Sequence, residues 1–303
     1  MNPVLALIIA NIIWGAASPI FKFSLENIPP FTLAFIRFFF AGLIFIPLTI
    51  GKWQKLTIKQ WFELFLLAFF GITINISFYF LGLKATESIN APIIASSGPI
   101  IIYILSVIFL KERLRPKKTM GMLLGLIGVM IIIFSPIFLD GKQFVMGEIT
   151  GNLLIFVATM GAVFQAIFGR GIMKKINAYQ ASLITFFFGA ISFFPFFINE
   201  LKNWSFTSLN ANGWLGIIFG VVFSSAIGYS LFYYGLSKIE AGDAGIYTYI
   251  DPVTAVLIAI PLLGEYPNLW YFLGSFLVFG GIYLAEGRIH WHPWHKLKKI
   301  SNY

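Results

Sequence analysis

The chain has 303 residues, of which 58% are hydrophobic and 11% are charged. A soluble domain has roughly 25% charged residues, so this composition excludes an ordinary soluble fold and favours a membrane protein. The formal net charge of +9 would suit nucleic acid, but the positive charges lie in short connections between apolar runs, and nucleic acid is not an expected partner. The absence of cysteine excludes disulfides and thiolate metal sites.

Apolar runs of about 20 residues, the length that spans a bilayer, follow one another along the chain. In chain order the ten predicted spans are Pro3–Phe21, Phe31–Ile50, Trp61–Leu83, Ile89–Leu110, Thr119–Phe138, Gly147–Ile172, Ala178–Ile198, Trp214–Leu236, Ala241–Leu263 and Leu269–Glu286. The first run resembles a signal peptide but lacks a positively charged start, so we expect it to be retained as a helix. The predicted fold is an all-α membrane protein with ten transmembrane helices.

The second half of the chain repeats the first. With an offset of 153 positions, Pro99 aligns with Pro252 and Glu112 with Glu265, and near the start an offset of 148 aligns a run of three phenylalanines in each half. Five crossings are an odd number, so the second copy must be inverted, as in many secondary transporters. The predicted organisation is a first five-helix repeat in residues 1–145, a second, inverted five-helix repeat in residues 146–288, and a basic and aromatic tail in residues 289–303.

Positive charge is concentrated in alternate connections. If the N-terminus is inside, the outer segments carry only Lys22, Lys84, Lys142 and Lys202, and the other lysines and most arginines are cytoplasmic. This bias is the positive-inside rule. The second copy of the basic connection keeps its glutamate, Glu265, but loses every positive charge, as an outward-facing loop should. We therefore expect a multi-pass protein of the plasma or inner membrane with both termini in the cytoplasm.

Several stretches resemble the EamA-type families of the drug/metabolite transporter superfamily. They are Ile13-Trp14-Gly15 followed by Lys22, Phe35-Ile36-Arg37-Phe38, and the run from Ala85 through Pro99 to Leu110-Lys111-Glu112-Arg113-Leu114, followed by Gly121 and Gly128. The second copy keeps the proline and the glutamate but lacks the arginine. The resemblance covers essentially the whole chain and implies a five-plus-five inverted-repeat carrier of small organic solutes, often an exporter. Because the family moves amino acids, sugars, nucleotide derivatives and drugs, the resemblance names no substrate.

Two prolines at equivalent positions indicate where the solute binds. Pro99 and Pro252 each lie about nine residues into a span, which is roughly 12–15 Å deep and near the bilayer midplane. Proline inside a helix frees a carbonyl and opens a kink, and matching interruptions in the two halves point to a transporter's binding site. The alternative is that both prolines only bend their helices for packing.

Asp251 is the clearest acid deep inside a predicted span, and its equivalent in the first copy is Gly98. Because an ionised carboxylate costs several kcal/mol in hydrocarbon, it should face the bundle interior and carry a coupling proton or bind a cationic amine. The alternative is a hydrogen bond between helices. The other candidate substrate-binding residues have polar or aromatic side chains and lie on spans that the resemblance places around the central cavity: Asn11, Trp14, Asn75, Tyr79, Ser96, Gln165, Ser225, Tyr229 and Tyr247. For the three amides, an interhelical hydrogen bond is an equal alternative.

Arg37 lies about two turns inside the outer end of the second span. It could bind an anionic substrate, but we expect its long side chain to snorkel to the surface or to form a structural pair, because the resemblance implies a peripheral second span. Six glycines suit close helix packing, either within one subunit or in a homodimer: Gly121, Gly125, Gly128, Gly274, Gly280 and Gly281.

The favoured function is a secondary carrier, by preference an exporter, that moves small organic metabolites such as amino acids by alternating access. A membrane-embedded enzyme is the second hypothesis, but the sequence has no His-Glu-x-x-His, no nucleophile elbow and no nucleotide-binding glycine loop. The three histidines between His290 and His295 are interpreted as part of an interfacial anchor, not a metal site. A channel or a non-transporting scaffold is the third. We expect no catalytic residue, metal or cofactor, and as partners a small-molecule substrate, the lipid bilayer and a coupling proton.

Overall fold

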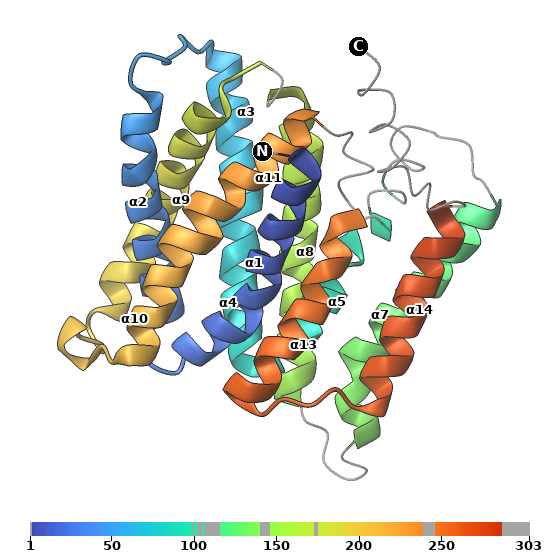
Figure 1. Ribbon diagram of the computed structural model, residues 1–303. Helices are drawn as coiled ribbons and strands as arrows, with labels where there is room; N and C mark the ends of the chain where they lie inside the picture. The colour runs from blue at the N-terminus through green and yellow to red at the C-terminus, as the bar shows by residue number, and fades with distance from the viewer. Residues whose placement is uncertain are drawn as a thin grey trace.

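The protein is described by a computed structural model that covers residues 2–98, 100–101, 105, 116–139, 146–172, 175–238 and 246–286. Within these residues all regular structure is helical, and Figure 1 shows the long helices side by side in one bundle. The helices are α1 Pro3–Ser24, α2 Pro30–Thr49, α3 Ile58–Ala68, η1 Phe69–Ile74, α4 Asn75–Ala85, α5 Asn90–Ala95, α7 Pro116–Leu139, α8 Met146–Ile172, α9 Ala178–Glu200, η2 Phe206–Ser208, α10 Ala211–Ile218, η3 Phe219–Ile227, α11 Gly228–Lys238, η4 Ile246–Tyr249, α13 Ile250–Leu263 and α14 Leu269–Glu286.

The all-α membrane fold is confirmed. Seven helical stretches of the described chain are long and apolar enough to cross a membrane, and two shorter apolar helices, Tyr247–Leu263 and Leu269–Leu284, add to them. Of the fourth predicted span, residues 99, 102–104 and 106–110 lie outside the described residues. This arrangement is consistent with the ten predicted crossings, while the inverted orientation of the two halves stays a prediction.

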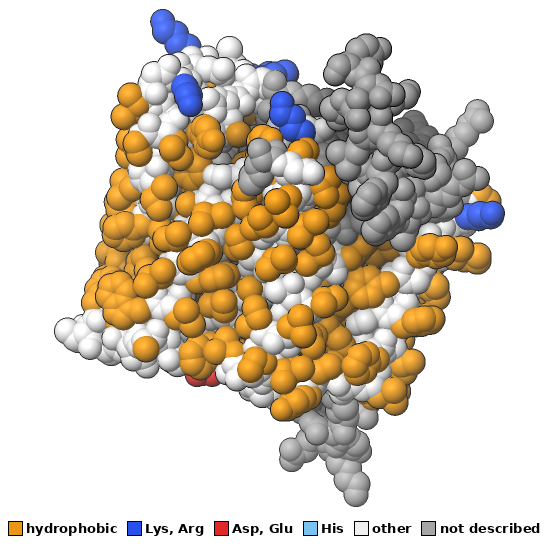
Figure 2. Space-filling view, viewed as in Figure 1, with side chains coloured by type: hydrophobic (Ala, Val, Ile, Leu, Met, Phe, Trp, Pro, Cys, Tyr) orange, Lys and Arg blue, Asp and Glu red, His pale blue; other side chains and the backbone are white. Residues whose placement is uncertain are grey.

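The outer surface of the bundle is apolar. Large hydrophobic side chains are exposed on several helices, including Phe276 at 75%, Leu257 at 68% and Ile191 at 67%, and such side chains cover the middle of the face drawn in Figure 2. A monomeric soluble protein rarely exposes a continuous apolar surface of this extent, so this face contacts lipid. On the same face, lysine and arginine side chains gather at the upper end, where α1 begins (Figures 1 and 2).

Helix α1 lies at the centre of the bundle and packs against α13, α11, α10, η3 and α4, while α2 pairs with α9 and α7 with α14. The α7–α14 pair depends on glycine, because a Cβ on Gly128 would lie 2.5 Å from the carbonyl oxygen of Gly274, and one on Gly281 would collide with the backbone of Gly121. Gly280 has open space around it. The predicted glycine packing at these positions therefore lies within the subunit.

Three spans are interrupted near their middle. Two contain a π-helical segment, η1 and η3. These segments lie at equivalent positions of the two repeats, because adding the offset of 153 to the bounds of η1 gives residues 222–227, which lie inside η3. The third changes from the 3-10 helix η4 to α13 at Ile250. The expected mid-helix kink at Pro252 is therefore wrong: this proline lies in the first turn of α13, where a helix needs no N–H donor. Pro99 lies outside the described residues.

Candidate functional site

The contact between α1 and the start of α13 forms the centre of the candidate site. A Cβ on Gly15 would lie 2.6 Å from the carbonyl oxygen of Asp251 and 2.8 Å from its Cα, so only glycine permits this approach. Asp251 lies in the first turn of α13, next to the positive end of the helix dipole. Its Oδ1 is buried and has no hydrogen-bond partner in the described part of the chain. An acceptor with no donor is thus held in the bundle interior.

Asn11 adds a second unpartnered acceptor one turn before Gly15. Residues four apart share a helix face, so Asn11 lies on the side of α1 that meets α13. Its side-chain nitrogen donates to the carbonyl oxygen of Leu7 at 2.8 Å. Its Oδ1 is buried and, among the residues that the structure describes, accepts no hydrogen bond. The alternative, an interhelical hydrogen bond, is not seen within the described residues, where the amide nitrogen bonds inside its own helix.

Aromatic side chains lie on α1 and on two helices that pack against it, α4 and α11. The Trp14 indole N–H donates to the carbonyl oxygen of Ser224 at 3.1 Å, and its ring packs edge-on against Tyr229 with 5.4 Å between centroids. Tyr79 lies on α4, which also packs against α1. Trp14 and Tyr229 are thus in contact next to Gly15, the residue that packs against Asp251.

Arg37 is buried, so the expected snorkelling is wrong and the other expected arrangement, pairing inside the protein, is the one observed. Its side chain is 3% exposed, its Nε donates to the Ser225 hydroxyl at 2.8 Å and its Nη2 donates to the Ser224 hydroxyl at 3.0 Å. The guanidinium carbon lies 5.0 Å from the centre of the Phe21 ring and 4.8 Å from that of Phe38. The π-helical segment η3 supplies both serines, and π-helices are frequent at functional sites. Arg37 therefore points into the bundle.

The remaining candidates make contacts of other kinds. The Asn75 side chain donates to the carbonyl oxygen of Ala158 on α8 at 2.7 Å, and the Gln165 side chain fills the space beside Gly71, so both amides stabilise the contact of α8 with α4 and η1. The Ser96 hydroxyl donates to the carbonyl oxygen of Pro92 at 2.9 Å. Tyr247, in η4, is half-buried. Within the described residues, no three His, Asp or Glu side chains are grouped to hold a metal.

A cluster of polar groups closes one end of the bundle. The Lys22 Nζ lies 2.7 Å from Oε1 of Glu265 and donates to the carbonyl oxygen of Thr86 at 2.6 Å. Oε2 of Glu265 accepts from the N–H and the hydroxyl of Ser88, at 2.7 and 2.6 Å. We call Lys22, Glu265, Thr86 and Ser88 the end cluster. It ties the end of α1 to the α4–α5 and α13–α14 connections.

The backbone after α13 places Glu265 in this cluster. Gly264 ends the helix in the left-handed conformation with φ of 67°, which glycine adopts at little cost. Beside the cluster, burial and the neighbouring carboxylates of Glu265 and Glu148 raise the pKa of Glu87, and Lys22 opposes this shift. The repeat could have pointed to Glu265, since it is the glutamate that the second copy keeps, but no pattern in the sequence names Ser88 as its partner.

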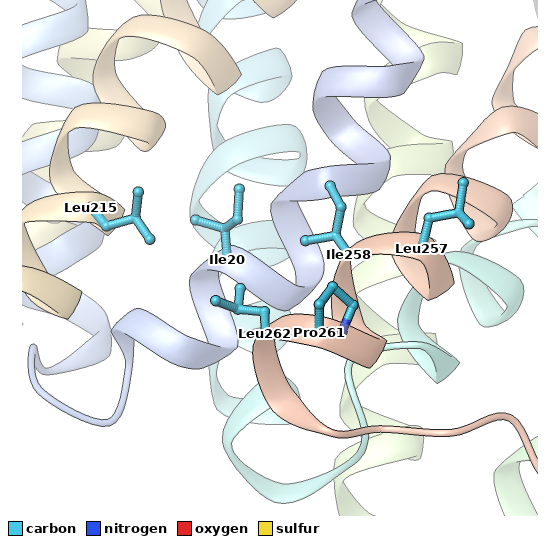
Figure 3. Close-up of a pocket in the computed structure, with 6 residues that line it drawn as sticks. All are labelled: Ile20, Leu215, Leu257, Ile258, Pro261 and Leu262. Atoms are coloured by element: carbon cyan, nitrogen blue, oxygen red, sulfur yellow. The ribbon is translucent and has the colours of Figure 1, made fainter.

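Two apolar grooves lie on the surface of the bundle. One, of about 380 Å³, lies between α1, α10 and α13 and is lined by aliphatic side chains that include Ile20, Leu215 and Pro261, as Figure 3 shows. The other, of about 650 Å³, lies between α13 and α14. Leu257 lines both grooves and is 68% exposed, so they open toward lipid. Neither groove includes the polar residues around α1.

The sequence matches the family described as the EamA-like transporter family over residues 1–134 and 149–286. The chain belongs to the EamA-like transporter family. It is therefore a multi-pass membrane protein whose family consists of transporters, in agreement with the apolar helices described above.

Relatives of this EamA-like protein extend over nearly its whole length. A protein of Archaeoglobus fulgidus named "Uncharacterized transporter" is 31% identical, and the match covers 93% of this chain and 97% of the relative. The "Uncharacterized transporter YetK" of Bacillus subtilis is 29% identical, with 94% and 87% covered. A solved crystal structure with 18% identity aligns with a TM-score of 0.64 over 93% of this chain and 96% of the other. That structure supports the fold alone.

Proposed function

We propose that this EamA-like protein is a secondary carrier that exports small organic metabolites, such as amino acids, by alternating access. The solute would bind between α1, α4, η3 and the first turn of α13. The observation that carries this proposal is the buried, unpartnered Oδ1 of Asp251 at a helix start inside the bundle. An ionisable group inside a membrane protein is costly and marks substrate or proton pathways. No catalytic role is proposed.

The chemistry around α1 favours a solute that donates hydrogen bonds. Asp251 and Asn11 each present a buried acceptor atom that has no donor among the described residues. An ammonium group has three N–H donors and no acceptor, so an amine satisfies both residues, and a proton satisfies Asp251 when the amine has left. The ring faces of Trp14 and Tyr229 attract a cation and form an apolar wall for the rest of the solute.

Alternating access requires that the two ends of the bundle open in turn. We propose that residues 1–145 and 146–288 are the inverted repeats and that both termini lie in the cytoplasm of a cell with the protein in its plasma membrane. In this orientation the end cluster closes the extracellular side. Export then includes a step in which the Lys22–Glu265 ion pair breaks and the solute leaves.

The test is transport by purified protein in liposomes. Asp251→Asn keeps the size of the side chain but cannot titrate, and Glu26→Gln removes an exposed carboxylate as the matched control. We expect Asp251→Asn to fold and insert normally, and either to lose amine transport or to move solute at a rate that no longer depends on pH. Glu26→Gln should behave like wild type. If Asp251→Asn transports like wild type at every pH, Asp251 only helps helix packing.

A further inference from the structure

Within the part of the chain that the structure describes, Arg37 forms no ion pair. The ion pair found among the described residues joins Lys22 and Glu265. Arg37 instead contacts two neutral hydroxyls and two phenylalanine rings. A buried cation without an anion costs several kcal/mol, so its retention needs a reason.

Helix packing alone does not supply that reason. The offset of 148 aligns Arg37 with Thr185, and the offset of 153 aligns Ser224 and Ser225 with Gly71 and Ile72. In the second half the Thr185 hydroxyl bonds to carbonyl oxygens of its own helix, α9, and α9 packs on η1. The equivalent contact is therefore built without a charge, and the combination of an arginine with two serines occurs at only one of the two equivalent contacts.

The three side chains offer donors to an anion. Arginine has five N–H donors in a planar fork that matches a carboxylate, and no acceptor. The hydroxyls of Ser224 and Ser225 each accept one N–H of Arg37, so each keeps its own proton to donate. The same segment is joined to the candidate site, because Trp14 donates to the carbonyl oxygen of Ser224.

We propose that Arg37, with Ser224 and Ser225, binds a carboxylate group of the transported solute and so selects solutes that carry one. This proposal rests on the proposed carrier function. The solute's carboxylate replaces the missing counter-ion of Arg37 in the loaded state, and the two phenylalanine rings stabilise the guanidinium when the site is empty. The distance between Arg37 and the unpartnered atoms of Asp251 and Asn11 then sets the length of the solute.

The test measures the thermal stability of purified, full-length protein with paired probes. Each of the standard L-amino acids is compared with its own amide, which keeps the side chain and the amine but lacks the carboxylate. A ligand that binds the folded state raises its stability. We expect at least one amino acid to stabilise the wild type and its amide to bind at least about tenfold more weakly, the equivalent of one charge-assisted hydrogen bond. Arg37→Met should bring the acid down to the level of the amide.

Controls separate recognition from folding. Lys84→Met removes an exposed cation and should leave the preference for the acid unchanged. If Arg37→Met does not fold, the double variant Ser224→Ala, Ser225→Ala replaces it and should weaken the acid but not the amide. The proposal is overturned if acid and amide bind equally, if no acid stabilises the wild type, or if inorganic phosphate stabilises it better than every acid. Binding or transport of the amides would leave the carrier function intact while this proposal fails.

Discussion

Glu265→Gln should open the end of the bundle that the end cluster closes. The substitution removes the ion pair with Lys22 and weakens the two short hydrogen bonds from Ser88, which are 2.7 and 2.6 Å long. Hydrogen bonds to a charged group contribute about 1 kcal/mol more than neutral ones, so the Ser88 bonds lose about 2 kcal/mol. The Lys22 side chain is 25% exposed, and the pair is discounted to about 1 kcal/mol for solvent screening. A loss of about 3 kcal/mol shifts the closed-to-open equilibrium by about 100-fold.

The assay is labelling of one introduced thiol, because the chain has no cysteine. Ser18 is fully buried and lies one turn from Lys22, so Ser18→Cys reports opening beneath the end cluster. With an impermeant maleimide, its labelling rate should rise by up to about 100-fold in Glu265→Gln, and the exposed Glu26→Gln should leave it unchanged. A lower melting temperature with no change in labelling would show that the cluster stabilises the fold but is not a gate, and would refute the reasoning.

Three further predictions concern topology, packing and pH. Lys117→Cys and Tyr266→Cys should differ in labelling by an impermeant reagent in intact cells, with only Tyr266→Cys reactive; equal labelling would contradict the inverted topology. Gly281→Ala should destabilise the protein by about 1–3 kcal/mol through overpacking, whereas Gly280→Ala, which meets open space, should not; equal melting temperatures would exclude close α7–α14 packing. The pKa of Glu87 is raised in the folded protein, so folding disfavours the charged form of this side chain. Glu87→Gln should therefore raise the melting temperature at pH 8, where glutamate is charged, but not below the ordinary pKa of glutamate, where it is already neutral. An equal rise at both pH values would contradict the raised pKa.

The helices could be predicted from the sequence because the membrane makes the pattern simple. A continuous apolar run of bilayer length must be helical to satisfy its own backbone, and the predicted starts and ends agree with α2, α8 and α9 to within a few residues. The interruptions could not be predicted. The π-helices have no turn residues to mark them, and the break before α13 comes at Ile250, so Pro252 begins a helix and does not bend one.

The candidate site was predicted in part, for a related reason. The burial of Asp251 could be predicted, because an acid inside a span faces the bundle interior. The inward orientation of Arg37 could not be predicted from the sequence. A side chain of this length at this depth in a span can either snorkel or turn inward, and the hydroxyls of Ser224 and Ser225 on η3 decide between the two. The end cluster joins residues more than 170 positions apart, and no local pattern encodes that contact.

The most direct test of the account measures both ends of the bundle at once by electron spin resonance. One pair of spin labels replaces Lys84 and Tyr266, beside the end cluster. A second pair replaces Lys59 and Lys238, which lie on the spans that contain η1 and η3, at the other end of the bundle. All four side chains are exposed. Alternating access predicts that Glu265→Gln lengthens the first distance and shortens the second. Distances that both stay fixed, or that change in the same sense, would contradict it.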